Sequence, residues 1–265
     1  MRVPLLYLLL FISVSLPSSA ANPEWVAQDK KIINEVTSLL KASPRTVERY
    51  FEKGIESGHN LGFGWRSRDA AIGGGYISIK AALYYYNGSL VSYTVYPGLP
   101  REQELKSKYV QWYSAGFKVS SAGVAPFRYN GALMQKPLSA LVKPPTSQVA
   151  TKAVVEYMSP ESGLEYGDYG GYGMTMLQNR EAFTQIQKGL SLEQVLLVMH
   201  SINPASRLTA IEYYLKNKEL FTNRPQIEQW VETVFRELPE VESIDGCIGG
   251  KYNAKELVAK FTKTE

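Results

Sequence analysis

The sequence predicts an α+β protein in which helices at both ends of the chain flank a central antiparallel sheet. Apolar residues recur at helical spacing after Asn22 and again after Leu177, whereas they alternate with a period of two from about residue 61. The Asn-Gly pair at Asn87 lies between two strand-like runs, which is the strongest short-range signal of a β-hairpin. We therefore expect an N-terminal helical hairpin, a sheet of about five or six strands and a C-terminal bundle of short helices.

Two helices are expected at the start of the folded part. Asn22 followed by Pro23 combines a capping side chain with a proline that suits the first helical turn. The next apolar residues fall on one stripe when the chain is wound at about 100° per residue, namely Trp25, Val26, Ile32, Ile33, Val36, Leu39 and Leu40. Ser43 and Pro44 repeat the start signal, so we expect a second helix that reaches Gly58.

The central hairpin is expected to pair Ile77–Tyr86 with Ser89–Tyr96 through a two-residue turn at Asn87-Gly88, which fixes the register. This register places Tyr85 opposite Leu90, Tyr84 opposite Val91 and Leu83 opposite Ser92. One face then carries Ile79, Leu83, Tyr85, Leu90 and Tyr96, and the other carries Lys80, Tyr84, Tyr86, Val91, Tyr93 and Val95. Neither face is plainly polar, so we expect both to be at least partly covered. The glycines at 73–75 predict a bend or a close backbone approach.

The rest of the middle region is expected to contain one helix and several shorter strands. The helix spans Arg101–Ala115, and strand candidates follow at Phe117–Ser120 and at Phe127–Met134, with a second Asn-Gly turn at Asn130. The proline-rich stretch 136–147 is expected to be a loop. A further hairpin is expected from residues 153–158 and 164–166.

Helical signals dominate after Leu177. The expected starts are Asn179, Ser191 with Gln194 as a capping box, Asn203-Pro204, Pro225 and Asn253. We divide the chain into a signal peptide at 1–20, an α+β domain at 21–178 that contains the sheet, and a helical subdomain at 179–265 packed on it.

Residues 1–20 have the layout of a secretory signal. Arg2 precedes an apolar run from Leu5 to Leu16, and the small residues Ser18 and Ala20 follow. The run is shorter than the roughly 20 apolar residues that a spanning helix needs. We therefore expect cleavage after Ala20, with Ala21 as the alternative site. Membrane contact is expected only through the signal before cleavage, and the mature protein is expected to be soluble and either secreted or periplasmic.

Composition narrows the possible functions. Hydrophobic residues make up 45% and charged residues 20% of the chain, as in an ordinary globular protein. The net charge is +4 for the full chain and +3 once Arg2 leaves with the signal, which is too small to indicate nucleic-acid binding. Cys247 is the only cysteine, so no intramolecular disulfide can form, whereas small secreted eukaryotic domains usually contain several. A bacterial envelope protein is therefore favoured, although Asn87-Gly88-Ser89 also matches a glycosylation sequence.

The most specific catalytic hypothesis is a thiol enzyme built on Cys247, which lies in a glycine-rich stretch. A nucleophilic cysteine needs a base within reach and a third group that orients the base. His59 or His200 would be the base, and Asp69 or Asp245 the orienting group. The local signatures of thiol proteases are absent, so a tight turn between two helices is the favoured interpretation of this stretch.

Neither a metal nor a cofactor is expected. His59, in a loop after a helix, and His200, beside the apolar stripe of a helix, have no recognisable ligand spacing. The phosphate-binding loop, the dinucleotide fingerprint and the serine-nucleophile elbow are all absent from the sequence. Glycoside hydrolysis needs only two suitably spaced carboxylates, so Glu156, Glu165 and Asp168 on one predicted hairpin leave a hydrolase open.

The segment 164–173 is the most unusual in the chain, with three tyrosines and four glycines in ten residues. Tyrosine combines a flat apolar ring with a polar hydroxyl, and glycine permits close approach, which together suit a binding loop. The predicted binding residues are Tyr166, Asp168, Tyr169 and Tyr172. The alternative interpretation is a glycine-kinked strand whose tyrosines pack on the helices.

These observations favour an exported envelope protein of non-catalytic type, which binds a partner protein or a glycan through tyrosine-rich surfaces. One alternative is an exported hydrolase that acts on glycan or peptide through carboxylates or Cys247. A second is an inhibitor or immunity-type protein.

Overall fold

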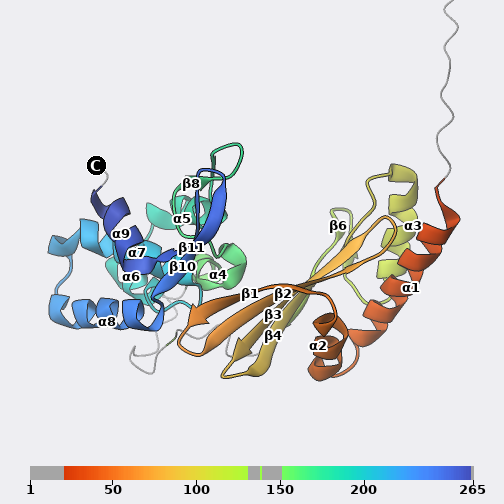
Figure 1. Cartoon of the computed structure of the whole chain (residues 1–265), viewed down its shortest axis with the longest axis horizontal. Helices are drawn as coiled ribbons and strands as arrows, with labels where there is room; N and C mark the ends of the chain where they lie inside the picture. The colour runs from red at the N-terminus through yellow and green to blue at the C-terminus, as the bar shows by residue number, and fades with distance from the viewer. Residues whose placement is uncertain (1–20, 131–137, 139–150, 264–265) are drawn as a thin grey trace, which may run out of the picture.

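The computed structural model describes residues 21–130, 138 and 151–263. The expected signal peptide, the turn predicted after Asn130 and most of the proline-rich loop lie outside the described residues. The chain has helices towards both ends and a five-stranded antiparallel sheet between them, which confirms the predicted α+β class. Helices α1–α3 lie at one end of the sheet and α4–α9 at the other (Figure 1). Within the described ranges, no helix has the length and apolar character needed to cross a bilayer.

The N-terminal helices are α1 (Pro23–Leu39) and α2 (Pro44–Glu52). As predicted, Asn22 caps α1, because its Oδ1 accepts hydrogen bonds from the N–H groups of Glu24 and Trp25 at 2.9 and 3.4 Å. The prediction that the second helix reaches Gly58 is wrong. Residues from Ile55 onward form β1 (Ile55–Gly62) instead, because their backbone groups pair with the neighbouring strand.

The main sheet has the order β1-β2-β3-β4-β7, and its neighbouring strands are antiparallel. The remaining strands are β2 (Trp65–Gly73), β3 (Ser78–Tyr86), β4 (Ser89–Tyr96) and β7 (Phe127–Asn130). Between β4 and β7 the chain forms α3 (Gln103–Tyr113) and a small hairpin of β5 (Val119–Ser120) and β6 (Gly123–Val124). The expected inserted helix is therefore present.

The predicted hairpin turn is present, but its register holds for only one pair. Asn87 and Gly88 have φ of 47° and 79°, and Tyr85 lies opposite Leu90 as expected. A bulge follows, so Tyr84 lies opposite Ser92 and Leu83 opposite Tyr93. The predicted pairs Tyr84–Val91 and Leu83–Ser92 are therefore wrong.

The bulge at Val91 decides which side chains share a core. Tyr93 and Val95 join Leu83 in the core beneath α1–α3, whereas Tyr96 packs on the other face with Tyr84. The predicted face assignments of these three β4 residues are wrong, because one extra residue reverses every later side chain. Both faces carry buried residues, as expected.

The glycines at 73–75 allow the close approach that the sequence indicates. Asp29 of α1 is fully buried, and its carboxylate accepts hydrogen bonds from Gly75 N at 2.6 Å and from the Tyr109 hydroxyl at 2.6 Å. A Cβ on Gly75 would lie 2.2 Å from Trp25 Cβ, whereas a Cβ on Gly73 would meet no atom within 4 Å. The bend therefore fastens α1 to the end of the sheet.

The C-terminal part contains most of the predicted helices. They are α5 (Gln178–Gln187), α6 (Leu192–Val198), α7 (Pro204–Lys216), α8 (Arg224–Glu237) and α9 (Ala254–Lys263), with short 3₁₀ turns η2 (Pro160–Ser162) and η3 (Lys218–Leu220). The capping box of Ser191 and Gln194 and the Asn203 cap are both present.

Several predictions in this part are wrong. Residues 164–166 form no strand, and α5 begins at Gln178, so Asn179 lies inside the helix and does not cap it. Residues 153–158 belong to helix α4 (Lys152–Met158) rather than to a strand, because Val154, Tyr157 and Met158 are buried at helical spacing. The stretch around Cys247 is the turn of a β-hairpin, β10 (Glu240–Asp245) and β11 (Ile248–Asn253), rather than a turn between helices.

The turn between β1 and β2 joins the sheet to the C-terminal helices. Phe63 stacks on Trp230 of α8 at a ring distance of 5.2 Å. Arg207 of α7 is fully buried and donates to the carbonyl of Leu61 at 2.9 Å and to two carbonyls of the α6–α7 loop. Burial lowers the pKa of Arg207 to about 9.

Candidate functional site

The tyrosine-rich segment 164–173 runs from the core to an exposed hairpin of β8 (Tyr169–Gly170) and β9 (Thr175–Met176). Tyr166 is buried, with 1% of its surface exposed, whereas Tyr169 is 51% exposed and Tyr172 fully exposed. One of the three tyrosines therefore packs inside the fold, as the alternative interpretation expected, and two face solvent.

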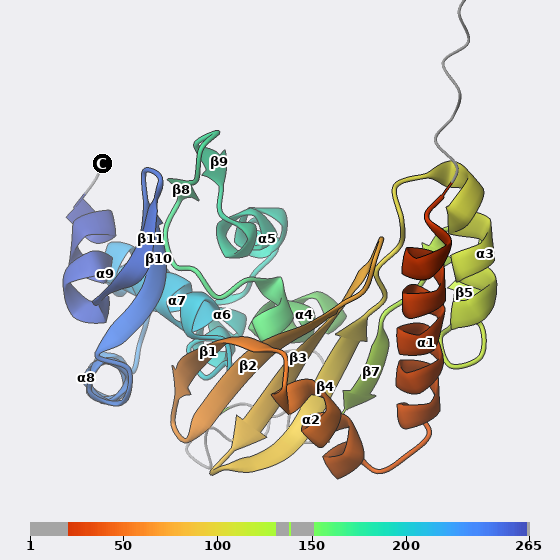
Figure 2. The same cartoon turned by 45° about the vertical axis from the view of Figure 1, so that its right-hand side comes forward.

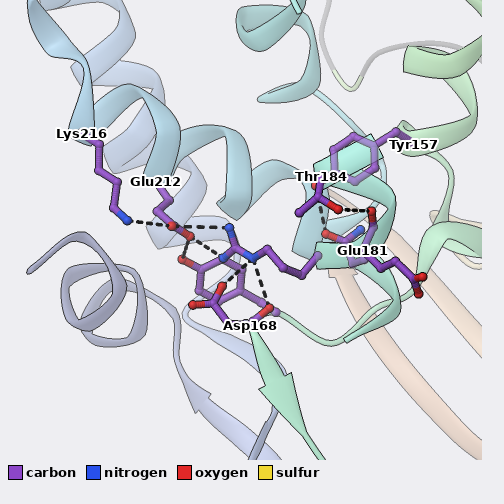
Figure 3. A network of polar contacts seen from close by, with 10 residues as sticks. Tyr157, Asp168, Glu181, Thr184, Glu212 and Lys216 are labelled. Atoms are coloured by element: carbon purple, nitrogen blue, oxygen red, sulfur yellow. Dashed lines mark hydrogen bonds and ion pairs between the residues drawn. The ribbon is translucent and has the colours of Figure 1, made fainter. Parts of the chain in front are cut away.

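A polar network holds the base of this segment in place (Figure 3). The Tyr166 hydroxyl donates to Glu212 Oε2 at 2.8 Å, and Arg180 Nη2 contacts the same oxygen at 2.6 Å. Arg180 Nε also pairs with Asp168 at 2.7 Å, and Lys216 approaches Glu212 Oε1 at 3.4 Å. Asp168, a predicted binding residue, is thus part of an anchor that ties the segment to α5 and α7.

Electrostatics stabilise the protonation states that this network needs. Burial and the neighbouring Glu212 carboxylate raise the pKa of Tyr166 well above its ordinary value, so its hydroxyl remains a donor. Burial opposes the charge on Arg180, but the carboxylates of Glu212 and Asp168 outweigh it and raise the pKa of the guanidinium. Tyr166 therefore stays a hydrogen-bond donor and Arg180 stays charged within the network.

The β8–β9 and β10–β11 hairpins lie side by side. Gly171 N donates to Gly246 O at 2.7 Å, and Tyr166 N donates to Glu242 O at 2.8 Å. A Cβ on Gly170 would lie 2.7 Å from Ile244 Cβ, so only glycine permits this approach. Both tips project on the same side of the molecule (Figure 2).

Four large apolar side chains are exposed on these paired tips. Tyr169, Tyr172, Met174 and Ile248 have exposed fractions of 51%, 101%, 58% and 72%, and we call them the two-hairpin surface. Isolated exposed apolar residues are common on proteins, but a cluster on a protruding element typically marks a site of interaction. Tyr169 and Tyr172 were predicted as binding residues from the sequence, whereas Met174 and Ile248 were not.

A groove of about 430 Å³ lies next to this surface, between β8–β9, β10–β11 and α9. Its lining combines aromatic and apolar side chains with polar ones: Asp168, Tyr169, Met174, Ser243, Ile244, Tyr252, Asn253, Glu256, Leu257, Lys260 and Phe261. Two of the predicted binding residues, Asp168 and Tyr169, are part of this lining.

A larger hollow of about 540 Å³ separates the sheet from α4 and α5. Its charged side chains include Arg128 and Glu161, which pair at 2.6 Å, and Glu161 also accepts a hydrogen bond from Thr94 at 2.6 Å. These contacts link the sheet to the C-terminal helices, and the polar groups of Arg128 and Glu161 already have partners in the protein. We therefore give the smaller groove priority, since it adjoins the exposed apolar cluster.

The carboxylates considered for a hydrolase do not share a hairpin. Glu156 lies on α4, is exposed and pairs with Lys152 at 3.7 Å. Asp168 pairs with Arg180 at 2.7 Å, and Glu165 lies outside the strands of the structure. Two of the three carboxylates, Glu156 and Asp168, are therefore already engaged in ion pairs.

The thiol hypothesis also gains no support from the geometry. Cys247 is exposed at the turn of the β10–β11 hairpin. His59 lies in strand β1 rather than in the loop predicted after a helix, and its ring contacts Asp69 at 3.1 Å and Glu242 at 3.5 Å. The hydrogen bond to Asp69 raises the pKa of His59, although burial opposes this. The predicted orienting residue Asp69 thus meets His59, but the described contacts of the ring do not include the thiol.

His200 is partly buried just after α6. Its ring stacks on Trp230 at 4.1 Å. Burial and the nearby charge of Arg207 lower the pKa of His200 to about 3, so the ring is neutral. In the described part of the chain, no group of three or more His, Cys, Asp or Glu side chains is arranged to hold a metal ion.

The fold and site define an α+β protein with a paired-hairpin surface next to an aromatic groove. No protein-family model, curated protein or solved structure matches the chain.

Proposed function

We propose that the mature protein is a non-catalytic exported protein of the bacterial envelope, which binds a partner protein on the two-hairpin surface. The observation that carries this proposal is the cluster of four exposed apolar side chains on adjacent tips, led by the fully exposed Tyr172. Tyrosine, methionine and other large apolar residues are enriched where proteins dock, and protein interfaces draw most of their affinity from a few such residues.

The anchoring of the hairpins supports this role. The network of Tyr166, Arg180 and Glu212 fixes one hairpin at its base, and the Gly171–Gly246 hydrogen bond joins the two tips. A surface held in one arrangement before binding loses less conformational entropy on association. The exposed side chains are therefore displayed on a preorganised support.

A glycan is the second partner class, and the groove favours it. The rings of Tyr169, Tyr252 and Phe261 line the groove together with the polar side chains of Asn253 and Glu256. Flat rings stack on the C–H faces of sugars, and amide or carboxylate oxygens accept hydrogen bonds from sugar hydroxyls. Protease and periodate treatment of the partner extract distinguish a protein from a glycan.

The test is capture from an envelope extract by the immobilised mature protein. The triple variant Tyr172→Ser/Met174→Ser/Ile248→Ser, which we call the tip variant, should retain about tenfold less partner or even less than that. The reason is that truncation of a hot-spot residue typically costs about 2 kcal/mol or more of binding free energy. The matched control Val119→Ser, Leu220→Ser removes exposed apolar side chains elsewhere and should retain the partner. If the tip variant captured as much partner as the wild type, binding through the two-hairpin surface would be contradicted.

The same experiment identifies the class of partner. Protease treatment of the extract should abolish capture if the partner is a protein. Abolition by periodate oxidation alone, which destroys sugar diols, would replace the protein by a glycan. Thermal unfolding of each variant must match that of the wild type, so that lost capture reports the surface and not the fold.

A further inference from the structure

The outer strand of the β10–β11 hairpin is an unpaired sheet edge. The hairpin forms a two-stranded sheet in which Asp245 lies opposite Ile248 across a two-residue turn. In such a hairpin alternate residues exchange hydrogen bonds with the partner strand, and those between them point their N–H and C=O groups outward. On β11 the outward-pointing residues are Gly249 and Lys251, which lie opposite Ile244 and Glu242.

The other strand confirms this alternation. Glu242 is predicted by the same rule to point outward from β10, and its carbonyl accepts the hydrogen bond from Tyr166 N at 2.8 Å. The tyrosine-rich segment thus covers the outer edge of β10. No described residue makes a backbone hydrogen bond to the outward groups of Gly249 or Lys251 on β11.

The exposed edge is also sterically open. Gly249 and Lys251 are both exposed, and a Cβ on Gly249 would meet no atom within 4 Å. A Cβ on Gly250 would meet only the ring of Tyr252, at 3.6 Å. Proteins usually protect edge strands with proline, several charges or a covering element, but β11 carries only Lys251 for this purpose.

We propose that β11 accepts an extended segment of the partner protein as a third strand, which deepens the proposed function and rests on it. The outward N–H and C=O groups of Gly249 and Lys251 supply the main-chain hydrogen bonds, as in other cases of strand addition. Ile248, 72% exposed at the start of the strand, joins the docked segment to the two-hairpin surface.

The side chains of β11 define the chemistry of the docking segment. Gly250 leaves space that an aromatic side chain of the added strand fills against Tyr252, since aromatic residues pack across edge glycines. The Lys251 side chain is 54% exposed, and its contact with Glu242 across the hairpin is long, at 4.0 Å, so the ammonium can also reach a carboxylate on the added strand. A carboxylate next to the aromatic residue, on the opposite face of the segment, pairs with Lys251.

A second copy of the chain fits this edge poorly. Antiparallel pairing of β11 with itself about Gly250 sets glycine opposite glycine, so the centre of the interface has no side-chain contact. The same arrangement brings the two Lys251 ammonium groups to neighbouring positions on one face, where like charges repel. The occupant is therefore a segment of a different protein.

Selection from random dodecapeptides displayed on phage tests the inference directly, because it does not require the partner itself. The immobilised mature protein should enrich peptides with an aromatic residue next to an acidic one, in an alternating strand-like pattern. A synthetic peptide from this selection should slow hydrogen exchange of the Gly249 and Lys251 amides by about tenfold or more, since both become hydrogen-bonded. Failure to enrich any such peptide, or protection elsewhere, would overturn the proposal.

Substitution of the edge separates backbone pairing from charge. Lys251→Pro removes an outward N–H and should weaken the peptide about tenfold or more, because the lost hydrogen bond adds to a steric block. Lys251→Thr keeps the N–H and should weaken it only about threefold, as expected for one exposed ion pair. Equal losses would show that charge alone is recognised and would overturn strand addition. If Lys251→Pro disrupts the hairpin, hydrogen exchange of the Gly249 and Lys251 amides in the wild type, with and without the peptide, decides whether strand addition occurs.

The outcome also separates this inference from the proposed function. If the tip variant loses the envelope partner while Lys251→Pro retains it, the two-hairpin surface stands and strand addition is wrong. If neither variant loses the partner, both proposals are wrong. Dimerisation of the wild type that Lys251→Pro abolishes would replace the foreign segment by a second copy.

Discussion

Tyr166→Phe separates the structural tyrosine of the tyrosine-rich segment from its exposed neighbours. The substitution keeps the ring and removes only the hydroxyl, which donates to Glu212 Oε2 at 2.8 Å. Only 1% of the Tyr166 surface is exposed, so this hydrogen bond is buried. The ring would remain packed against Phe261, its edge-to-face neighbour at 5.5 Å. The experiment therefore measures one buried hydrogen bond to a charged acceptor.

The expected cost follows from the partners of Glu212. Hydrogen bonds to charged groups contribute roughly 1.5–3 kcal/mol to stability. Arg180 still contacts the same carboxylate oxygen at 2.6 Å after the substitution, so the charge stays compensated. We expect the lower part of the range, about 1.5–2 kcal/mol, which lowers the Tm of a domain of this size by roughly 3–8 °C.

Chemical denaturation and thermal unfolding measure this effect, and Tyr172→Phe is the matched control. Tyr172 is fully exposed, so loss of its hydroxyl should change the free energy of unfolding by less than about 0.5 kcal/mol. Tyr166→Phe should also leave partner capture within about twofold of the wild type, since the buried ring makes no surface contact. Equal stability of Tyr166→Phe and the wild type would refute the anchoring role of the network.

Three further predictions concern stability. His200 has a folded pKa of about 3, below its unfolded value of about 6.5, so its contribution is complete above pH 6.5 and is lost as pH falls. Between pH 6.5 and 4.5 the free energy of unfolding, measured in urea titrations, should therefore fall by roughly 2–3 kcal/mol more for the wild type than for His200→Phe. Arg207→Met should cost about 3 kcal/mol or more, because three buried carbonyls lose their donor, whereas exposed Arg66→Met should cost less than about 0.5 kcal/mol. Gly75→Ala should cost about 1–3 kcal/mol in thermal unfolding because its Cβ collides with α1, whereas Gly73→Ala should be nearly neutral.

Each of these predictions has a result that would contradict it. Parallel pH profiles for the wild type and His200→Phe would mean that the ring titrates normally in the folded protein. Equal stabilities of the two arginine variants would show that the buried guanidinium does not hold the turn between β1 and β2. Equal stabilities of the two alanine variants would show that the bend at 73–75 does not contact α1 closely.

Local signals predicted the fold class and most helix starts. Asn22, Ser191 and Asn203 cap helices where the sequence placed them, because a cap depends only on residues within one turn. The Asn87-Gly88 turn is likewise present, because both residues adopt the positive φ that the turn requires.

Tertiary packing decided the features that were predicted wrongly. The bulge at Val91 places Tyr93 and Val95 in the core beneath α1–α3. The residues of the turn give no indication of this burial. Lys152–Met158 is short and combines alternating with helical apolar spacing, so its burial against α5–α7 determines that it is a helix.

The candidate site was only partly predictable for a similar reason. Tyr169 and Tyr172 stand out in the sequence by composition, but Ile248 belongs to a stretch whose glycines indicated only a turn. Arg180 and Glu212, which anchor the segment, are 32 residues apart and carry no local signal of their pairing. The sequence holds two signals of the β10–β11 hairpin, namely the alternation in 240–245 and the glycine at 246. Neither is specific enough to predict a hairpin rather than a turn between helices.

Site-specific photo-crosslinking in the native envelope tests the central claim most directly. A benzophenone side chain in place of Tyr172, at the exposed tip, should form an adduct with one partner protein. The same side chain in place of Val119, which is 41% exposed, should not form that adduct, because strand β5 lies beside α3 at the other end of the molecule (Figure 2). No adduct at Tyr172, or the same adduct from both positions, would contradict binding through the two-hairpin surface.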